Sequence, residues 1–142
     1  RENFRPFAPI ILKNKLNDWF NLKQDSPYMG IVSQIKDDKK IKVDNLHLDG
    51  LKNINVSRSV VPAITHVDYS SRIQTVDGKF NPEIYSLLLK FFEITNVPIL
   101  VNTSFNLSNE PIVCTVTDAY KTFMTSGLKL LVCGNFIIRK KN

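Results

Sequence analysis

The chain has 142 residues, 43% of them hydrophobic and 23% charged, which is the balance of a soluble globular protein of one domain. No apolar run approaches the ~20 residues that a membrane helix needs, and no signal peptide is visible, so we expect a cytoplasmic protein without a membrane partner. The net charge of +6 would serve an anionic small substrate as well as it would serve nucleic acid, although clusters of surface lysines are usually only solvated. Nucleic acid is disfavoured, because no aromatic residues are interleaved with the lysine clusters.

The first half of the chain predicts short strands separated by polar loops, because its apolar runs are brief and are interrupted by proline, asparagine and charged residues. The expected segments are a strand at 7–12, a short helix at 14–22, a strand at 28–35, a loop at 37–55 with one short strand at 41–43, and an edge strand or extended segment at 59–64.

Strands alternate with helices in the second half. Residues 72–76 predict a strand, and the following helix is expected to begin after the cap Asn81 and to end at Asn96. Five apolar residues at helical spacing predict one buried stripe on it, namely Ile84, Leu87, Leu88, Phe91 and Phe92.

The last third predicts a buried strand at 99–102, a helix at 119–126 and a final strand at 128–138 that is interrupted at Gly134-Asn135. Thr115 and Asp118 have the spacing of a capping box at the start of that helix. The fold class is therefore α/β or α+β, with a twisted mixed sheet in a single domain over 1–142.

The two cysteines have neither a metal-ligand nor a redox spacing. We interpret Cys114 and Cys133 as reduced thiols of the core, and a disulfide between them is the less favoured alternative.

The first candidate site follows the strand at 99–102, where seven residues include five short hydroxyl or amide side chains. Such groups at the carboxyl end of a buried strand are good donors to an anion or a nucleotide. A plain turn rich in serine and asparagine is the alternative interpretation. No glycine-rich phosphate loop and no nucleophile triad accompanies it, so the chemistry expected here is positioning and charge compensation.

The second and third candidates carry charged side chains. His66 and Asp68 could bind a metal, but no third ligand is evident, and a loop anchor with the carboxylate holding the imidazole is favoured. Arg72 begins a strand of apolar and neutral residues, and its guanidinium suits phosphate or carboxylate. Arg1 and Arg5 could grip an anion or form structural salt bridges, and the sequence does not decide between them.

Five blocks of sequence occur in one order that is far more specific than any one of them. Together they resemble the C-terminal domain of the O-carbamoyltransferase family, of the type found in nodulation-factor and antibiotic tailoring, over residues 1–139. The blocks are Arg5–Pro9, Ser26–Met29, Pro62–Asp68, Ser71–Val76 and Val101–Asn106.

The resemblance implies a YrdC-like domain that follows an N-terminal domain of the actin-like ATPase superfamily, so we interpret the chain as a fragment of a longer enzyme. It implies that carbamoyl phosphate and ATP, with Mg²⁺, give carbamoyl-adenylate here. The carbamoyl group would then pass to a hydroxyl of an acceptor held by the N-terminal domain, which would carry a further metal. We expect no metal in this domain, and we expect the fragment to fold but to transfer nothing by itself.

The resemblance also suggests binding residues, although it assigns no catalytic residue. Arg72, Ser104 and Asn106 match positions expected to contact phosphates or the carbamoyl-adenylate. Four further residues match motif positions without an assigned role, namely Arg5, His66, Asn102 and Thr103.

Two residues depart from the family pattern. Asn109 and Tyr69 stand where glycine is usual, and asparagine is the non-glycine residue that best tolerates a positive φ. Two other functions stay open on the sequence, a YrdC-like RNA-binding module and a non-catalytic regulatory domain that binds a nucleotide.

Overall fold

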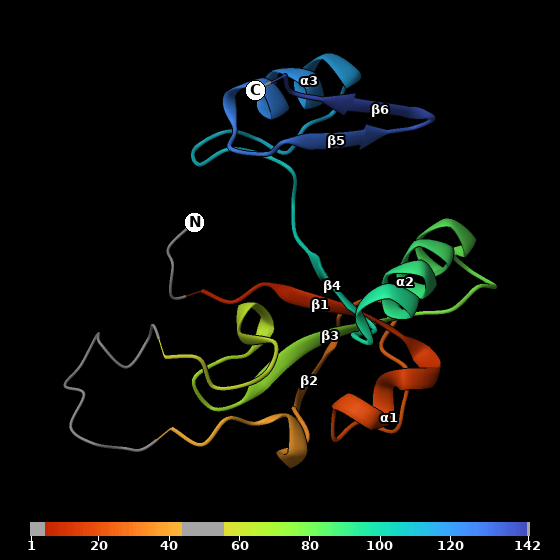
Figure 1. Ribbon diagram of the computed structural model, residues 1–142, viewed down its shortest axis with the longest axis vertical. Helices are drawn as coiled ribbons and strands as arrows, with labels where there is room; N and C mark the ends of the chain where they lie inside the picture. Colours follow the sequence, from red (N-terminus) through yellow and green to blue (C-terminus); the bar gives the residue numbers. More distant parts are fainter. Residues whose placement is uncertain (1–4, 44–55, 142) are drawn as a thin grey trace. The chain divides into compact units, whose positions relative to one another are not determined.

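The computed structural model describes residues 5–43 and 56–141. The chain divides into two compact units, Arg1–Asn102 and Thr103–Asn142, and each unit has a sheet of its own (Figure 1). Of the predicted loop at 37–55, only residues 37–43 are among the described residues. The prediction of a single domain over 1–142 stays a prediction.

The first unit is built on a four-stranded sheet with the strand order β2-β3-β1-β4 (Figure 1). β3 runs parallel to β1, whereas β2 and β4 are antiparallel to their neighbours. The sheet is thus mixed, as predicted from the sequence. Its strands are β1 (Ala8–Leu12), β2 (Ile31–Gln34), β3 (Ser70–Val76) and β4 (Ile99–Asn102).

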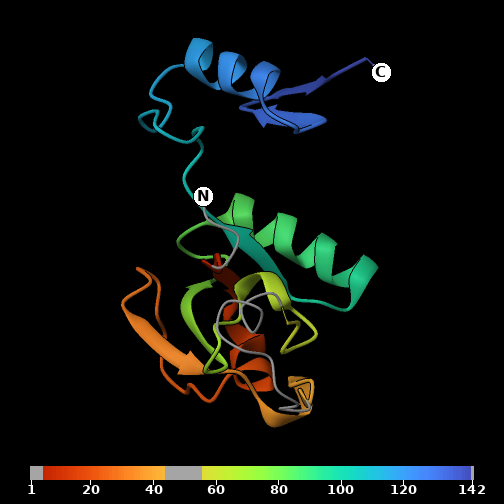
Figure 2. The same ribbon diagram turned by 90° about the vertical axis from the view of Figure 1, so that its left-hand side faces the viewer.

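Each face of this sheet carries its own apolar cluster, because successive strand residues point to opposite sides. On one face, Ile11, Ile73 and Ile99 pack with Trp19 of α1 (Leu16–Trp19) and with Phe20. On the other face, the cluster comprises Leu12 and Val76 of the sheet and Leu88 of α2 (Pro82–Thr95). Figure 2 shows α2 alongside β4.

The ends of α2 are those that the sequence predicts. The side chain of Asn81 accepts a hydrogen bond from the amide of Ile84, Pro82 opens the helix, and Asn96 ends it with a φ of +57°. The buried stripe differs from the prediction, because Leu87 is 56% exposed and Phe91 is not among the residues that pack against the cluster around Leu88. The stripe is centred on Leu88. The helix residues that pack with it are three or four positions away or directly adjacent to it, namely Ile84, Tyr85, Leu89 and Phe92.

Three predictions for the first half are wrong in detail. The helix expected at 14–22 is a 3₁₀ turn, Lys13–Lys15, followed by the single turn of α1. Residues 41–43 form no strand. The segment 59–64 is not extended throughout, because Pro62–Ile64 forms a 3₁₀ helix with proline at its first position. The hydroxyl of Thr65 closes this turn by donating to the carbonyl of Val61 at 3.0 Å.

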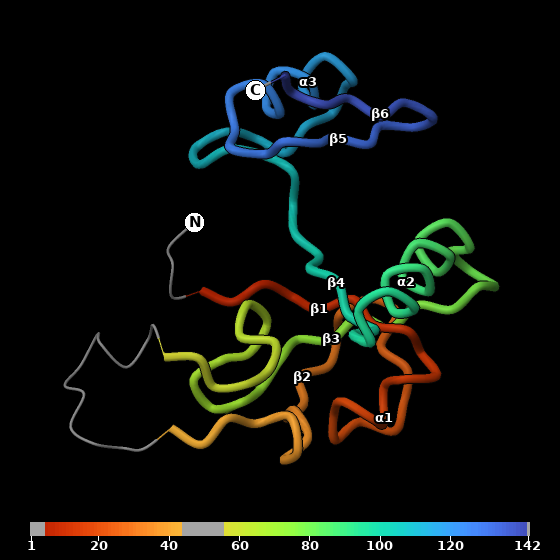
Figure 3. Tube along the Cα trace, viewed as in Figure 1, coloured from red at the N-terminus to blue at the C-terminus, as the bar shows by residue number. Residues whose placement is uncertain are grey.

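The second unit contains α3 (Val116–Thr125) and a hairpin of β5 (Leu130–Cys133) and β6 (Phe136–Arg139). The capping box at the start of α3 is confirmed, since Thr115 and Asp118 exchange both of its hydrogen bonds. Figure 3 shows the tight turn between β5 and β6, where Gly134 has a φ of +55°. Glycine at the first turn position matches the twist of the two strands.

Both cysteines are free thiols, but the expectation that they lie in the core is wrong. Cys114 is exposed just before α3, and Cys133 is half-buried. Asn109 adopts a φ of +67°, as its replacement of a glycine predicts. No helix in the described parts of the chain is long and apolar enough to cross a membrane.

Candidate active site

Polar residues occupy part of the sheet face on which α2 lies. Along β3, Val76 packs under α2, whereas Arg72 on the same side of the strand is exposed. Its cross-strand partner Val32 is 61% exposed, so α2 leaves this end of the face open. The open end of the face therefore presents a guanidinium group on a regular strand.

A pair of amide side chains joins β4 to β3 on the same face. The side chain of Asn102, at the end of β4, donates to Gln74 of β3 across the intervening strand β1. Ala8 of β1 lies directly opposite Asn102, and its small side chain leaves room for this contact. Gln74 in turn donates to the carbonyl of Pro27 at 2.9 Å. The two amides thus connect β3 and β4 to the turn before β2.

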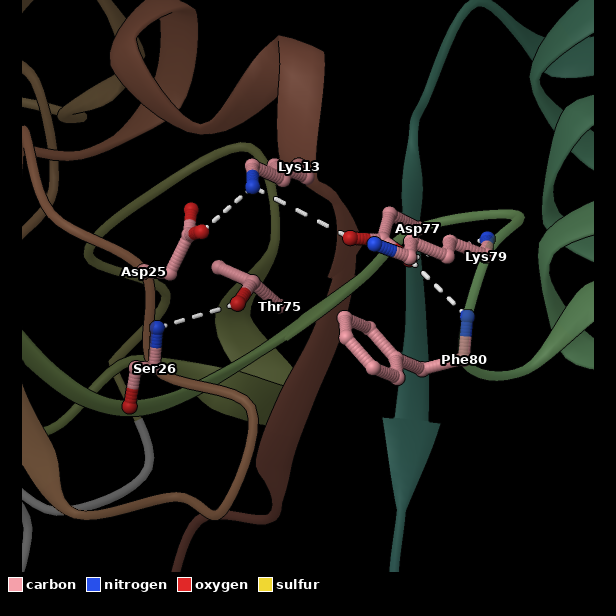
Figure 4. Close-up of polar contacts among 7 residues, drawn as sticks. All are labelled: Lys13, Asp25, Ser26, Thr75, Asp77, Lys79 and Phe80. Carbon is pink, nitrogen blue, oxygen red and sulfur yellow. Dashed lines mark hydrogen bonds and ion pairs between the residues drawn. The ribbon is translucent and has the colours of Figure 1, made fainter.

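That turn, Ser26–Met29, is fixed to β3 by buried hydrogen bonds. The hydroxyl of Ser26 donates to the carbonyl of Ile73 at 2.8 Å. The amide of Ser26 donates to the Oγ1 of Thr75 at 3.0 Å, and the amide of Thr75 donates back to the carbonyl of Ser26 at 3.0 Å (Figure 4). Tyr28 at the tip of the turn is nevertheless 91% exposed. The backbone of this turn is held in place while its aromatic ring stays in solvent.

A cavity of about 540 Å³ lies beside this turn. The sheet contributes Ile10, Gln74 and Val76 to its lining, and two turns contribute Tyr28 and Phe80. Its size is in the range of pockets that bind small molecules. The cavity and the open polar face therefore share Gln74.

An ion-paired lysine lies at the edge of the cavity. The Lys13 ammonium is 2.5 Å from a carboxylate oxygen of Asp25 and 3.9 Å from one of Asp77 (Figure 4). The hydrogen bond to Asp25, with the negative charges of both carboxylates, raises the pKa of Lys13 above its ordinary value. These three residues also line a second hollow of about 330 Å³. The lysine is positive throughout the physiological range.

The predicted site residues fall into both units. Arg72 and Asn102 lie on the open face of the first unit. Asn102 is half-buried and donates a hydrogen bond to Gln74. Arg5 is exposed where the described chain begins. Thr103 and Ser104, both exposed, open the second unit directly after Asn102.

Asn106 supports the turn that follows it. Its side-chain amide donates to the carbonyl of Leu107 at 3.1 Å and to that of Glu110 at 2.9 Å. The backbone amide of Val113 donates to the carbonyl of Phe105 at 3.1 Å, which brings the segment back on itself. The hydroxyl- and amide-rich segment after β4 is thus an ordered turn, and one of its amide side chains helps to hold it.

His66 and Asp68 belong to a tight turn that leads into β3. The amide of His66 donates to the carbonyl of Ser70 at 2.9 Å. The Asp68 carboxylate accepts from the hydroxyl of Ser70 at 2.7 Å and from its amide at 3.0 Å, and these bonds lower the pKa of Asp68. Asp68 is thus a loop anchor, as favoured from the sequence, but its partner is Ser70 rather than the imidazole.

Tyr69, in the same turn, has a φ of +65°, which is rare for a bulky residue. Its ring packs against the apolar cluster of Ile11 and Ile73, and the Lys40 ammonium lies 5.1 Å from its centroid. Packing of the ring offsets the unfavourable backbone conformation.

Three residues of the site were missed from the sequence, namely Gln74, Tyr28 and Phe80. Gln74 could have been found, because it stands two positions after Arg72 and so shares its face of the strand. Tyr28 and Phe80 gave no such signal, since an exposed aromatic residue in a turn is common.

No group of three or more histidine, cysteine or acidic side chains is placed to hold a metal ion among the residues that the structure describes. The polar groups on the open face are a guanidinium and two amides. Such groups suit oxygen atoms of phosphate or carboxylate better than a cation.

Comparison with known proteins identifies the family. Residues 1–140 match the family described as carbamoyltransferase C-terminus. The chain is 48% identical over 142 residues to the uncharacterized protein sll1178 of Synechocystis, and 38% identical over 144 residues to the nodulation protein NolNO of Sinorhizobium fredii. It is 27% identical over 135 residues to the 3'-hydroxymethylcephem-O-carbamoyltransferase of Amycolatopsis lactamdurans.

These alignments cover 99%, 99% and 95% of the chain but only 23%, 18% and 22% of the respective relatives. The chain therefore spans about a fifth of the length of the relatives that it matches. It belongs to the carbamoyltransferase C-terminal family, whose members include O-carbamoyltransferases.

Proposed function

We propose that this chain is the part of an O-carbamoyltransferase that binds ATP and carbamoyl phosphate and forms carbamoyl-adenylate. Carbamoyl phosphate first loses its phosphate to water and leaves carbamate. A carbamate oxygen then forms a bond to the α-phosphorus of ATP while pyrophosphate leaves. Transfer of the carbamoyl group to a hydroxyl of the acceptor releases AMP and a proton.

The observation that carries this proposal is that the guanidinium of Arg72 is exposed on a regular strand and is not ion-paired among the described residues. The neighbouring polar side chains on that face, Gln74 and Asn102, are uncharged amides. A guanidinium beside neutral donors is suited to bidentate binding of a phosphate group.

We propose a role for the polar groups of each unit by itself. In the first unit, Arg72 binds phosphate. Asn102 belongs to the same binding region, and its hydrogen bond to Gln74 holds its side chain in place. Ser104 and Thr103 supply hydroxyl groups and Asn106 orders the turn that carries them, so that this segment orients the carbamoyl group or the nucleotide phosphates. Arg5 and His66 are proposed to belong to the binding region around Arg72 in the first unit, and neither is assigned a chemical role of its own.

Displacement at phosphorus depends on positioning and on compensation of charge more than on a protein nucleophile. Mg²⁺ is expected to arrive on the phosphates of ATP, since it is usually held by substrate oxygens and few protein ligands. We propose that the acceptor hydroxyl and the further metal are held by an N-terminal domain. The free thiols Cys114 and Cys133 are consistent with a cytoplasmic location.

The test is pyrophosphate release by the full-length protein with ATP and carbamoyl phosphate together. We expect Arg72→Ala to lower this rate at least 100-fold, because a charge-assisted bidentate contact is lost. Arg72→Lys should recover only part of the rate, since a lysine keeps the charge but not the fork. Arg139→Ala, an exposed arginine of β6, is the matched control and should leave the rate unchanged.

Near-normal pyrophosphate release by Arg72→Ala would remove Arg72 from the site. Absence of release by the wild-type full-length protein with both substrates would overturn the proposed reaction. We also expect the chain of 142 residues alone to fold but to carbamoylate no acceptor. Carbamoylation by that chain alone would contradict the assignment of the acceptor to another domain.

A further inference from the structure

We infer that the cavity of about 540 Å³ beside β3 binds a planar heterocyclic ring, the base of a nucleoside, by stacking on Tyr28 and Phe80. The inference rests on the proposed function in one respect, because the nucleoside would then be that of ATP. It assigns a binding role to two residues outside the polar groups described above.

The first support is the exposure of both rings. Tyr28 is 91% exposed and Phe80 is 81% exposed, yet both line this cavity. Single exposed aromatic residues are ordinary on a protein surface. Two rings that line the same hollow from separate segments of the chain form an apolar surface to which a flat aromatic ligand can stack.

The second support is that both turns are held firmly at their backbones. Ser26 and Pro27 are hydrogen-bonded to β3 through Ile73, Thr75 and Gln74. These contacts hold the turn that carries Tyr28 close to the sheet without using the ring itself. A rigid backbone beneath an exposed ring lowers the entropy that is lost when a ligand orders it.

The turn that carries Phe80 is fixed in a comparable way. The carboxylate of Asp77 accepts from the amides of Lys79 at 2.9 Å and Phe80 at 3.1 Å (Figure 4). Gly78 lies against the ring of Tyr85. A Cβ atom added to Gly78 would lie 3.1 Å from the nearest carbon of that ring. A side chain at this position would crowd the Tyr85 ring, so this turn too is closely defined.

The third support is the position of the cavity relative to Arg72. Val76 and Gln74 line the cavity, and Arg72 is the next residue on the same side of β3. Four residues of a strand span about 13 Å. An extended nucleoside triphosphate has a comparable reach from its base to its phosphates, so one ligand can stack in the cavity and meet the guanidinium.

The test measures the affinity of the chain for adenosine, ATP and inorganic tripolyphosphate by calorimetry. We expect Tyr28→Ala and Phe80→Ala each to weaken adenosine and ATP binding by about 5- to 150-fold, the range for loss of a stacked ring. Tripolyphosphate carries no base, so its affinity should not change. Tyr28→Phe keeps the ring and should bind adenosine as the wild type does.

Phe136→Ala is the matched control, since Phe136 is a 75% exposed phenylalanine that does not line the cavity. It should leave all three affinities unchanged. Because Tyr28 and Phe80 are so exposed, their alanine variants should unfold at the same denaturant concentration as the wild type. This measurement separates a lost contact from a lost fold.

Wild-type binding of adenosine that neither alanine variant weakens would overturn the inference and leave the proposed function standing. Failure of the wild type to bind adenosine would also overturn the inference. Ring-dependent adenosine binding in a full-length protein that releases no pyrophosphate would support the inference and reject the proposed reaction.

Discussion

The two faces of the four-stranded sheet are made by alternate residues of the same strands, yet they differ in what covers them. One face, with Ile11, Ile73 and Ile99, is closed by the apolar cluster around Phe20. The opposite face is covered by α2 at one end only, and at the other end it presents Arg72 to solvent. One closed face and one half-open face allow a small sheet to have both a core and a site.

Along β3, buried residues alternate with more exposed polar ones. Ser71, Ile73 and Thr75 are buried on the closed face, whereas Arg72 is exposed and Gln74 half-buried on the other. Two residues of the closed face, Thr75 and Ile73, also help to hold the turn that carries Tyr28.

The largest expected effect separates two consecutive residues of β3. Ile73 is fully buried, and Ile73→Ala should lower the free energy of unfolding by about 3–5 kcal/mol, because the surrounding cluster is large and has little freedom to collapse. Arg72→Ala should change it by less than about 0.5 kcal/mol, since the side chain is exposed. Denaturant unfolding of both variants measures the contrast.

Similar destabilisation by both substitutions would contradict the assignment of the two faces. Ile73→Val is the conservative control and should lower the free energy of unfolding by about 0.5–1.5 kcal/mol. A loss of pyrophosphate release in Arg72→Ala without a loss of stability would place that residue in the site rather than in the core.

A smaller effect tests the end of the face that α2 covers. Leu88 is fully buried in a cluster with half-buried neighbours that can relax, so Leu88→Ala should lower the free energy of unfolding by about 2–3 kcal/mol. The adjacent Leu87 is 56% exposed, and Leu87→Ala should change it by less than about 0.5 kcal/mol. Equal destabilisation by the two alanines in denaturant unfolding would show that α2 packs by a different stripe.

Much of this architecture follows from local sequence signals. The caps Asn81 and Thr115 and the left-handed Asn96 act within a few residues. α2 therefore begins and ends where the sequence predicts, whereas α3 begins directly after its predicted cap, at Val116 rather than at the expected residue 119. The exposure of Leu87 could not be predicted in this way. It depends on the direction in which α2 crosses the sheet, which is a property of tertiary packing.

Parts of the candidate site can be predicted for the same reason. Arg72 stands out as the charged residue of β3, and Asn102 as the polar residue that ends the apolar strand β4. The cavity lined by Gln74, Tyr28 and Phe80 depends on the pairing of β3 with β1, and therefore on contacts between residues far apart in the sequence. The 3₁₀ helix at Pro62–Ile64 was missed because side-chain hydroxyls of Ser59 and Thr65, 2.7 Å apart, stabilise that turn.

The smallest expected effect concerns the turn that leads into β3, the strand that carries Arg72. The Ser70 hydroxyl bond, with that of the Ser70 amide, holds the pKa of Asp68 below its usual range. A carboxyl whose folded pKa is depressed stabilises the fold above its unfolded pKa of about 3.9, and this contribution is lost as the pH falls through the lower folded value. Carbon-detected NMR titration should place the Asp68 pKa below the value of about 3.9 that is usual for an unfolded aspartate.

Ser70→Ala removes the hydroxyl donor but keeps the amide donor, so it should raise the Asp68 pKa only part of the way to its usual value. Ser86→Ala removes a serine hydroxyl that donates to a backbone carbonyl of α2 and should leave the Asp68 pKa unchanged. The gap in stability between the wild type and Ser70→Ala should narrow as the pH falls from 5 to below the folded pKa. A gap that stays constant over that range would mean that Ser70 acts by packing and not by holding the carboxylate that anchors the turn before Arg72.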